Sequence, residues 1–309
     1  MLLVLAAALG GLAFATTSHW ARAHTRSAAP VRRLSPKPKP PKPLPRPQTQ
    51  PVPALLHGPP LLHHVFRPRL TAAAAVLVDA RTGRILWARR PHERRPIAST
   101  TKIMTAVVAL EHLRRDQVIR VVPVATRKPL VREGLRPRER VPAWKLFYGL
   151  LLFSGNDDAM ALAYGVSGNR RGFLALMNAK ARALGLRDTH FTSTSGVIDR
   201  GNRSSAWDLA ALARYAMRSA RFRAIVRKRI VHLRWSAPTY SKVYVNKNQL
   251  LTTYPGADGV KTGWTTIAGH CLVASAHRGG RRLIAVVLHA GNPYGDARRL
   301  LNFGFSHPL

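Results

Sequence analysis

Short apolar runs separated by a turn signal mark the start of a folded region near residue 70. Residues 73–79 and 84–88 are dominated by alanine, valine, leucine, isoleucine and tryptophan, and Gly83 lies in the polar turn between them. Two such runs around a glycine turn predict an antiparallel β-hairpin.

Helical periodicity dominates the middle of the chain. In residues 99–113, apolar side chains from Ile103 to Leu113 recur at spacings of three and four, which predicts an amphipathic helix. The same pattern predicts further helices at 144–152, 157–164, 171–184 and 206–217.

Two apolar segments near the carboxyl terminus, 270–276 and 282–289, flank Gly279 and Gly280 and predict a second pair of strands. Strands at both ends of the folded region, with helices between them, indicate an α+β fold whose first and last strands join one sheet.

The first part of the chain differs in composition. Residues 2–15 are almost continuously apolar, a length typical of a secretory signal rather than of a full membrane span. No basic residue precedes this run, so residues 1–23 are predicted to be either a signal peptide or a short retained anchor. Residues 24–69 are rich in proline, lysine and arginine, which predicts a disordered, extended linker. Within it, His63 and His64 lack a third ligand, so we predict no metal site there.

The chain of 309 residues is strongly basic, with 50 Lys and Arg against 13 Asp and Glu and a formal net charge of +37. Such a charge favours polyanions, namely nucleic acid, an anionic membrane surface or an acidic wall polymer. A genome biased toward arginine is an equally good explanation. The 46% of hydrophobic residues excludes a wholly disordered chain. The single cysteine, Cys271, excludes an intramolecular disulfide and lies in an apolar strand, which predicts a buried, inert thiol.

The first candidate for chemistry is Ser99, three residues before Lys102 at the start of a predicted helix. This spacing places both side chains on one helix face. A serine hydroxyl becomes nucleophilic when a neighbour takes its proton, and a lysine can do so if burial or a nearby cation lowers its pKa. The alternative is that Ser99 only caps the helix.

Two further motifs follow. At residues 154–156, Ser-Gly-Asn can project a hydroxyl that relays a proton and an amide that binds a substrate amide; the alternative is an ordinary turn. At residues 261–263, Lys-Thr-Gly on an edge strand would present an ammonium group and a hydroxyl. Lys261 would also help to keep Lys102 neutral; the alternative is a solvated lysine.

The residues around these motifs are more specific than the motifs themselves. They read PIASTTKIMTA at 96–106, SGNDDA at 154–159 and GVKTGWT at 259–265. In this order they resemble the serine-type D-alanyl-D-alanine carboxypeptidases, the low-molecular-mass penicillin-binding proteins, over about residues 72–302. The resemblance implies a penicillin-binding/β-lactamase-like fold, with an antiparallel sheet flanked by helices and a helical subdomain that carries the second motif. The catalytic domain would span 70–309.

The resemblance also implies roles for individual residues. Ser99 would form an acyl-enzyme, Lys102 would be its general base, and Ser154 would pass a proton to the departing amine. No metal or cofactor is implied.

For substrate binding, the resemblance implies that Asn156 holds the peptide backbone, while Lys261 and Thr262 bind the terminal carboxylate. The backbone N–H groups of Ser99 and Trp264 would form an oxyanion hole.

Two departures and two exclusions accompany the resemblance. A class A β-lactamase needs a glutamate between the second and third motifs, and the chain has none there; the class C pattern begins its second motif with tyrosine, not with Ser154. Ser193 and Thr194 replace a usual Asn-Pro pair, and Asn202 replaces a histidine, so both put peptide preference in doubt.

We therefore expect an exported, extracytoplasmic D-Ala-D-Ala carboxypeptidase that trims peptidoglycan stem peptides and is acylated by β-lactam antibiotics. Anionic wall polymers or a membrane surface are further candidate partners, and nucleic acid is not expected. The alternatives are a D,D-endopeptidase on wall crosslinks, a non-catalytic wall-binding protein, and a polyanion-binding protein that rests on charge alone.

Overall fold

The structure, a computed structural model, describes residues 55–60, 68–197, 201–234 and 241–307. The segment predicted as signal or anchor, most of the predicted linker, and His63 and His64 lie outside these residues. None of the described helices has the length and apolar character that crossing a lipid bilayer requires.

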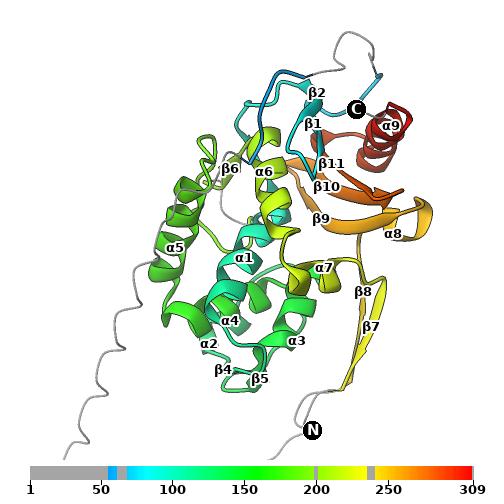
Figure 1. Ribbon diagram of the computed structural model, residues 1–309. Helices are drawn as coiled ribbons and strands as arrows, with labels where there is room; N and C mark the ends of the chain where they lie inside the picture. The colour runs from blue at the N-terminus through cyan, green and yellow to red at the C-terminus, as the bar shows by residue number, and fades with distance from the viewer. Residues whose placement is uncertain (1–54, 61–67, 198–200, 235–240, 308–309) are drawn as a thin grey trace, which may run out of the picture. The chain divides into compact units, whose positions relative to one another are not determined.

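A five-stranded antiparallel sheet forms one side of the folded unit (Figure 1). Its order is β2-β1-β11-β10-β9, so the first long strand pairs with the last, and the predicted sheet is confirmed. The third motif lies on β9 at the edge of this sheet. The strands are β1 (Ala74–Asp79), β2 (Ile85–Arg89), β9 (Ala257–Thr265), β10 (Gly269–Arg278) and β11 (Arg281–Ala290).

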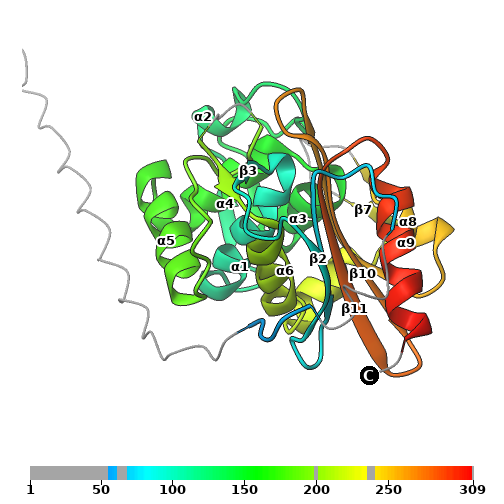
Figure 2. The same ribbon diagram turned by 90° about the horizontal axis from the view of Figure 1, so that it is seen from above.

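Helices cover both faces of the sheet, as Figure 2 shows for α9 (Pro293–Ser306) on one face and α6 (Ala206–Ala216) on the other. The side chains of β1 alternate between two hydrophobic cores: Val76 belongs to the core on the α6 side, and Leu77 to the core under α9. Burial on both faces explains why this strand is apolar throughout rather than alternating with polar residues.

Helix α9 was not predicted. Its start nevertheless has a signal, because the Asn292 side chain accepts a hydrogen bond from the Gly295 N–H at 2.9 Å and Pro293 occupies the first turn. Leu300 and Leu301 bury its apolar side under the sheet.

The helical part is built around α1 (Lys102–His112), which contacts α4, α5, α6 and α7. The predicted helices are confirmed, except that the one expected at 144–152 divides into an α-helix and a π-helical turn. These elements are α3 (Ala143–Tyr148), the turn η2 (Gly149–Phe153), α4 (Asn156–Ser167) and α5 (Arg170–Ala183). The remaining short elements are β3 (Arg95–Pro96), η1 (Ala98–Thr101), β4 (Val118–Arg120), α2 (Pro123–Thr126), β5 (Arg140–Pro142), β6 (Arg203–Ser204), α7 (Ala220–Val226), β7 (Ile230–Leu233), β8 (Lys242–Val245) and α8 (Leu250–Thr253).

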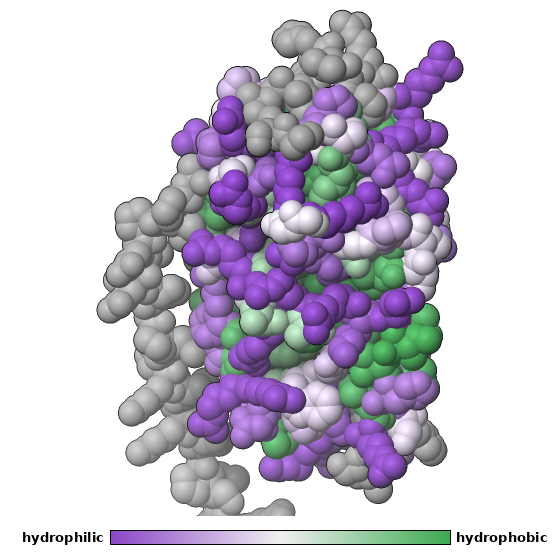
Figure 3. All heavy atoms as spheres, turned by 45° about the vertical axis from the view of Figure 1, so that its right-hand side comes forward, coloured by the Kyte–Doolittle hydropathy of each residue, from purple (hydrophilic) through white to green (hydrophobic). Residues whose placement is uncertain are grey.

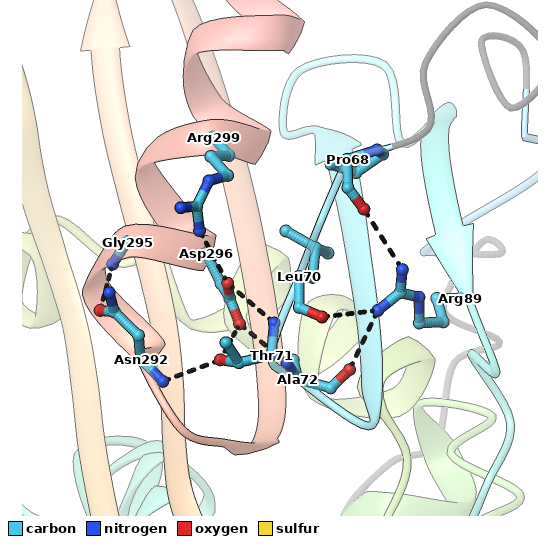
Figure 4. Close-up of polar contacts among 9 residues, drawn as sticks. All are labelled: Pro68, Leu70, Thr71, Ala72, Arg89, Asn292, Gly295, Asp296 and Arg299. Carbon is cyan, nitrogen blue, oxygen red and sulfur yellow. Dashed lines mark hydrogen bonds and ion pairs between the residues drawn. The ribbon is translucent and has the colours of Figure 1, made fainter.

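Asp296 of α9 fixes the segment that leads into β1 (Figure 4). Its buried carboxylate accepts hydrogen bonds from the Thr71 N–H at 3.1 Å, the Thr71 hydroxyl at 2.8 Å and the Ala72 N–H at 2.8 Å. The guanidinium of Arg89 donates to three carbonyl oxygens of the same segment, those of Pro68, Leu70 and Ala72. The beginning and the end of the folded unit are thereby joined.

Residues 55–57 also belong to this unit, although the sequence placed them in the disordered linker. Leu55 and Leu56 are buried in the core on the α6 side, and the Arg214 guanidinium donates to the Leu55 carbonyl at 2.8 Å. His57 forms a β-bridge with Arg84. Burial of these two leucines stabilises an ordered segment within a proline-rich part of the chain. The composition of the segment alone does not show this, because it says nothing about what the leucines contact.

We predict that Asp296→Ala lowers the free energy of unfolding by about 2–3 kcal/mol, because it leaves two backbone N–H groups at the start of β1 without their acceptor. Thermal unfolding would show a drop in Tm of roughly 5–10 °C. Arg299→Ala is the control, since its i,i+3 ion pair to Asp296 is half exposed and worth less than about 0.5 kcal/mol. Equal Tm values for the two variants would contradict the assigned role of Asp296.

Candidate active site

Ser99 and Lys102 meet at the beginning of the central helix. Ser99 lies in the 3₁₀ turn η1, which continues directly into α1, and the Lys102 Nζ lies 3.0 Å from the Ser99 Oγ. Lys102 is fully buried, and Ser99 is 8% exposed. Neither η1 nor α1 has a side-chain cap, so the alternative that Ser99 caps the helix is wrong.

Lys102 has two further hydrogen-bond partners besides Ser99. Its Nζ lies 2.9 Å from the Asn156 Oδ1 and 3.1 Å from the Ser195 carbonyl oxygen, and all three acceptors are uncharged. Burial and, next, the charge of Lys261 hold the pKa of Lys102 well below its usual range. A buried amine with no carboxylate bonded to it is suited to stay neutral and to accept a proton.

The second motif reaches the first through its amide rather than through its hydroxyl. Ser154 ends η2 with a left-handed backbone (φ 74°), and Asn156 begins α4. The Asn156 Nδ2 donates to the Pro129 carbonyl at 3.0 Å, which turns its Oδ1 toward Lys102. Ser154 is 4% exposed. Its role in proton transfer stays a prediction.

The third motif brings a second buried lysine to the site. Lys261 on β9 is 2% exposed, so the alternative of a solvated lysine is wrong. Its Nζ donates to the Thr262 carbonyl at 3.0 Å. Burial, followed by the charge of Lys247, lowers the pKa of Lys261 to about 7. The Thr262 side chain is half-buried beside it.

Gly263 allows β9 to pass close to the Ser99 turn. A Cβ at this position would lie 3.0 Å from the Ser99 N and 3.1 Å from the Ile97 carbonyl oxygen. Both atoms belong to the backbone, so neither can give way as a side chain would. The glycine of the third motif is therefore needed for the approach of the two motifs.

A cavity of about 400 Å³ opens beside Ser99. Trp264 lies at its border and is 58% exposed, as expected of a residue that meets a ligand rather than the core. Apolar side chains such as Ile97, Val131 and Ile267 form much of the lining. The oxyanion hole at the N–H groups of Ser99 and Trp264 stays a prediction.

Asn202, which the sequence marks only as a departure from the family pattern, supports a loop next to the site. Its side chain accepts hydrogen bonds from the Thr192 and Ser193 N–H groups, both at 2.8 Å, and donates to the Thr101 hydroxyl at 3.0 Å. Asn202 thus shapes the loop that offers the Ser195 carbonyl to Lys102. Asn202 also lines the cavity beside Ser99, so its link to peptide preference stays a prediction.

Ser193 and Thr194 take part in the same support. The Ser193 Oγ accepts from the Gly196 N–H at 3.0 Å, and the Thr194 carbonyl accepts from the Thr105 hydroxyl of α1 at 2.6 Å. The thiol of Cys271 is buried, and burial raises its pKa to about 11, which agrees with the expected inert cysteine.

Comparison with known proteins agrees with this geometry. Residues 63–292 match the D-alanyl-D-alanine carboxypeptidase family of peptidases. The chain belongs to this family. It is 36% identical over 251 residues to the D-alanyl-D-alanine carboxypeptidase DacF of Bacillus subtilis, an alignment that covers 77% of this chain and 64% of that protein. It is 35% identical over 267 residues to a D-alanyl-D-alanine carboxypeptidase of Streptomyces strain K15, covering 78% and 90% of the two chains.

Solved structures of family members confirm the fold. The DD-transpeptidase of Streptomyces K15 superposes with a TM-score of 0.73 at 31% identity, covering 78% of this chain and all of that one. A penicillin-binding protein homologue from Mycobacterium tuberculosis gives a TM-score of 0.74 at 33% identity, with coverage of 78% and 94%. The predicted penicillin-binding-protein-like α+β class is thus correct, and the chain is placed among the hydrolases that act on peptides.

We predict that Gly263→Ala slows acylation by penicillin roughly 10-fold, because β9 and the Ser99 turn must move apart by a few tenths of an ångström, which misaligns the reacting groups. Gly291→Ala is the control, since its new Cβ would make only ordinary contacts at 3.5 Å or more. Rates would be measured by stopped-flow mixing, with Tm as a check on folding. An unchanged rate in the Gly263 variant would refute the close-approach argument.

Proposed function

We propose that the protein is an exported serine-type D-alanyl-D-alanine carboxypeptidase that removes the terminal D-alanine of peptidoglycan stem peptides through an acyl-Ser99 intermediate. The observation that carries this proposal is the buried Lys102 Nζ at 3.0 Å from the Ser99 Oγ, with only neutral acceptors around it. Membership of the family and the relatives' names support the same reaction.

The reaction begins with attack of the Ser99 Oγ on the carbonyl carbon of the penultimate residue, while the hydroxyl proton passes to the neutral Lys102. The resulting tetrahedral adduct collapses when its C–N bond breaks, and the departing amine of D-alanine takes up a proton by way of Ser154. Water then attacks the Ser99 ester, which releases the shortened peptide and restores the serine hydroxyl.

The other motif residues bind the substrate. Lys261 and Thr262 would hold the free carboxylate of the terminal D-alanine, and Asn156 would hold the peptide backbone. The N–H groups of Ser99 and Trp264 would stabilise the oxyanion, where the loss of one donor costs about 2.7–4 kcal/mol.

The deciding experiment compares D-alanine release from a peptide ending in D-Ala-D-Ala by the wild type and by Ser99→Ala. We expect release that penicillin abolishes in the wild type, and at least a 1,000-fold loss in Ser99→Ala, because removal of an activated serine costs up to about a millionfold in kcat. Ser241→Ala, which changes an exposed serine, is the control and keeps full activity. Release by Ser99→Ala at the wild-type rate would sink the proposal.

The two lysines predict a bell-shaped pH dependence of kcat/KM. Lys102 must be neutral to accept a proton, so kcat/KM falls on the acid side as pH drops through its lowered pKa. Lys261 must be charged to attract a carboxylate. In the enzyme without substrate its pKa is about 7, so kcat/KM also falls as pH rises above about 7.

Lys261→Arg separates these two effects. An arginine keeps its charge across the whole range, so the fall near pH 7 should disappear while the acid side stays in place. An alkaline fall that persists unchanged in Lys261→Arg would assign it to another group.

A second candidate reaction is transpeptidation, because one structural relative, from Streptomyces K15, is named a DD-transpeptidase. An acyl-Ser99 can be taken by water or by an acceptor amine, and both routes need the same residues. Incubation of substrate with increasing glycylglycine would separate them, because a transpeptidase forms the longer peptide at the expense of the hydrolysis product. Digestion of crosslinked wall fragments tests the endopeptidase alternative in the same way.

Export and wall binding complete the proposal. The apolar residues 2–15 favour secretion, and fusing residues 1–23 to a reporter that is active only outside the cytoplasm tests it. The net charge of +37 favours anionic wall polymers or an anionic membrane surface as partners. Hydrophilic residues cover much of the face seen in Figure 3. Equal retention on purified wall with and without its anionic polymers would count against the polymers.

A further inference from the structure

Three carboxyl groups lie together behind the second motif, at residues the chemistry of the three motifs does not use. They belong to Glu133, Asp157 and Asp158, and among the described residues no such group is arranged to hold a metal ion. A buried cluster of acids is costly unless each charge is compensated or removed. The contacts of each carboxyl group show how the charge of this cluster is compensated or removed.

Asp157 is compensated by backbone donors. Its carboxylate accepts hydrogen bonds from the N–H groups of Glu133 at 3.0 Å, Gly134 at 2.9 Å and Leu135 at 3.1 Å. Three such bonds stabilise the ionised form. Asp157 is thus the member of the 157–158 pair that has hydrogen-bond donors.

Asp158 has no such compensation. Its side chain is fully buried, and neither oxygen receives a hydrogen bond from an N–H or O–H group of a described residue. Its carboxyl occupies the hollow beneath the turn of the second motif, because a methyl group added at Gly149 or at Gly155 would overlap it. The Gly155 N–H donates to the Gly149 carbonyl at 3.0 Å and closes this turn over Asp158.

Glu133 faces Asp158 across the same space. A methyl group at Gly149 would overlap the Glu133 Oε2 and the Asp158 Oδ1 together, so the two carboxyls are near neighbours. Glu133 itself has donors: the Tyr244 hydroxyl at 2.7 Å and the Lys242 Nζ at 3.3 Å. Of the two acids, Glu133 is thus the one equipped to carry a charge.

We propose that Asp158 is held as a neutral carboxylic acid that donates a hydrogen bond to Glu133, and that this pair positions the second motif and removes the charge of Asp158 from the surroundings of Lys102. Two carboxylates in one buried space cannot both ionise, and a shared proton resolves the conflict. The inference rests on the proposed function, in which Lys102 acts as a neutral base.

The electrostatics of the surroundings agree with this assignment. Burial and the neighbouring Glu133 raise the pKa of Asp158 well above its usual range. Burial raises the pKa of Glu133 as well, but Lys242 and the Tyr244 hydroxyl oppose that rise. An ionised Asp158 would raise the pKa of Lys102. The charged and titratable groups that act on Asp158 or are acted on by it are Glu133, Asp157, Lys242, Tyr244 and Lys102.

Infrared spectroscopy of the full chain tests the location of the proton directly. We expect a carbonyl stretch of a protonated carboxylic acid at pH 7 that is absent from Asp158→Asn and present in Glu133→Gln. Asp116→Asn, which changes an exposed carboxylate, is the control and leaves the band unchanged. A band that disappears in Glu133→Gln but not in Asp158→Asn, or no band in the wild type, would overturn the proposal. Because Glu133→Gln is a separate protein, the test stands even where Asp158→Asn fails to fold.

The pH dependence of penicillin acylation tests the consequence for Lys102. Asp158→Asn keeps a neutral hydrogen-bond donor in place. We therefore expect its acylation rate to lie within about twofold of wild type and the acid side of its pH profile to stay where it is. Asp158→Ala loses the hydrogen bond to Glu133, so its acylation should slow at least tenfold. An ionised Asp158 would instead make the acid side of Asp158→Asn move down by about one pH unit, because a nearby charge is removed. A wild type that penicillin does not acylate would refute the proposed function, whereas the infrared result would still locate the proton.

Discussion

The position of one amino group decides much of this structure. The Lys102 Nζ is fully buried, and its three acceptors come from chain segments far apart in the sequence: the Ser99 turn, the start of α4 at Asn156 and the loop at Ser195. Because no carboxylate bonds to this group, burial disfavours its charged form and leaves an amine that can take a proton. The helical part must bring all three segments around α1. The same packing that folds this part of the protein therefore also activates the serine.

This arrangement has a cost in stability. A second lysine, Lys261, is buried close by, and Glu133, Asp157 and Asp158 lie behind the second motif. Burying each of these ionisable groups costs free energy unless its charge is compensated or removed. The sheet packed between two hydrophobic cores contributes free energy of folding that offsets the cost of the buried polar site. Such a trade-off between stability and activity is common in enzymes.

Local sequence patterns were sufficient for the long strands, the central helices and the three motifs, because each depends on neighbours within a few residues. They could not reveal Asn202, whose importance arises from hydrogen bonds to Thr192, Ser193 and Thr101. Nor could they distinguish Asp158 from any other acid near a helix start, since its hollow is formed by Gly149 and Gly155 and its neighbour is Glu133. Burial of Leu55 and Leu56 was equally invisible, because the surface they cover is assembled from distant segments.

The hydrogen bonds around Asp296 and Arg89 also have a mechanical meaning. They tie residues 68–72 to α9 and β2 at once (Figure 4). Beyond them, β1 is paired along its whole length with β11. A pull on the chain from its amino-terminal side would first load residues 55–57, which are held by the Arg214 guanidinium of α6 and by the β-bridge to Arg84. It would then load the bonds around Asp296 and Arg89, so the force would meet two separate sets of contacts, one on α6 and one on α9 and β2.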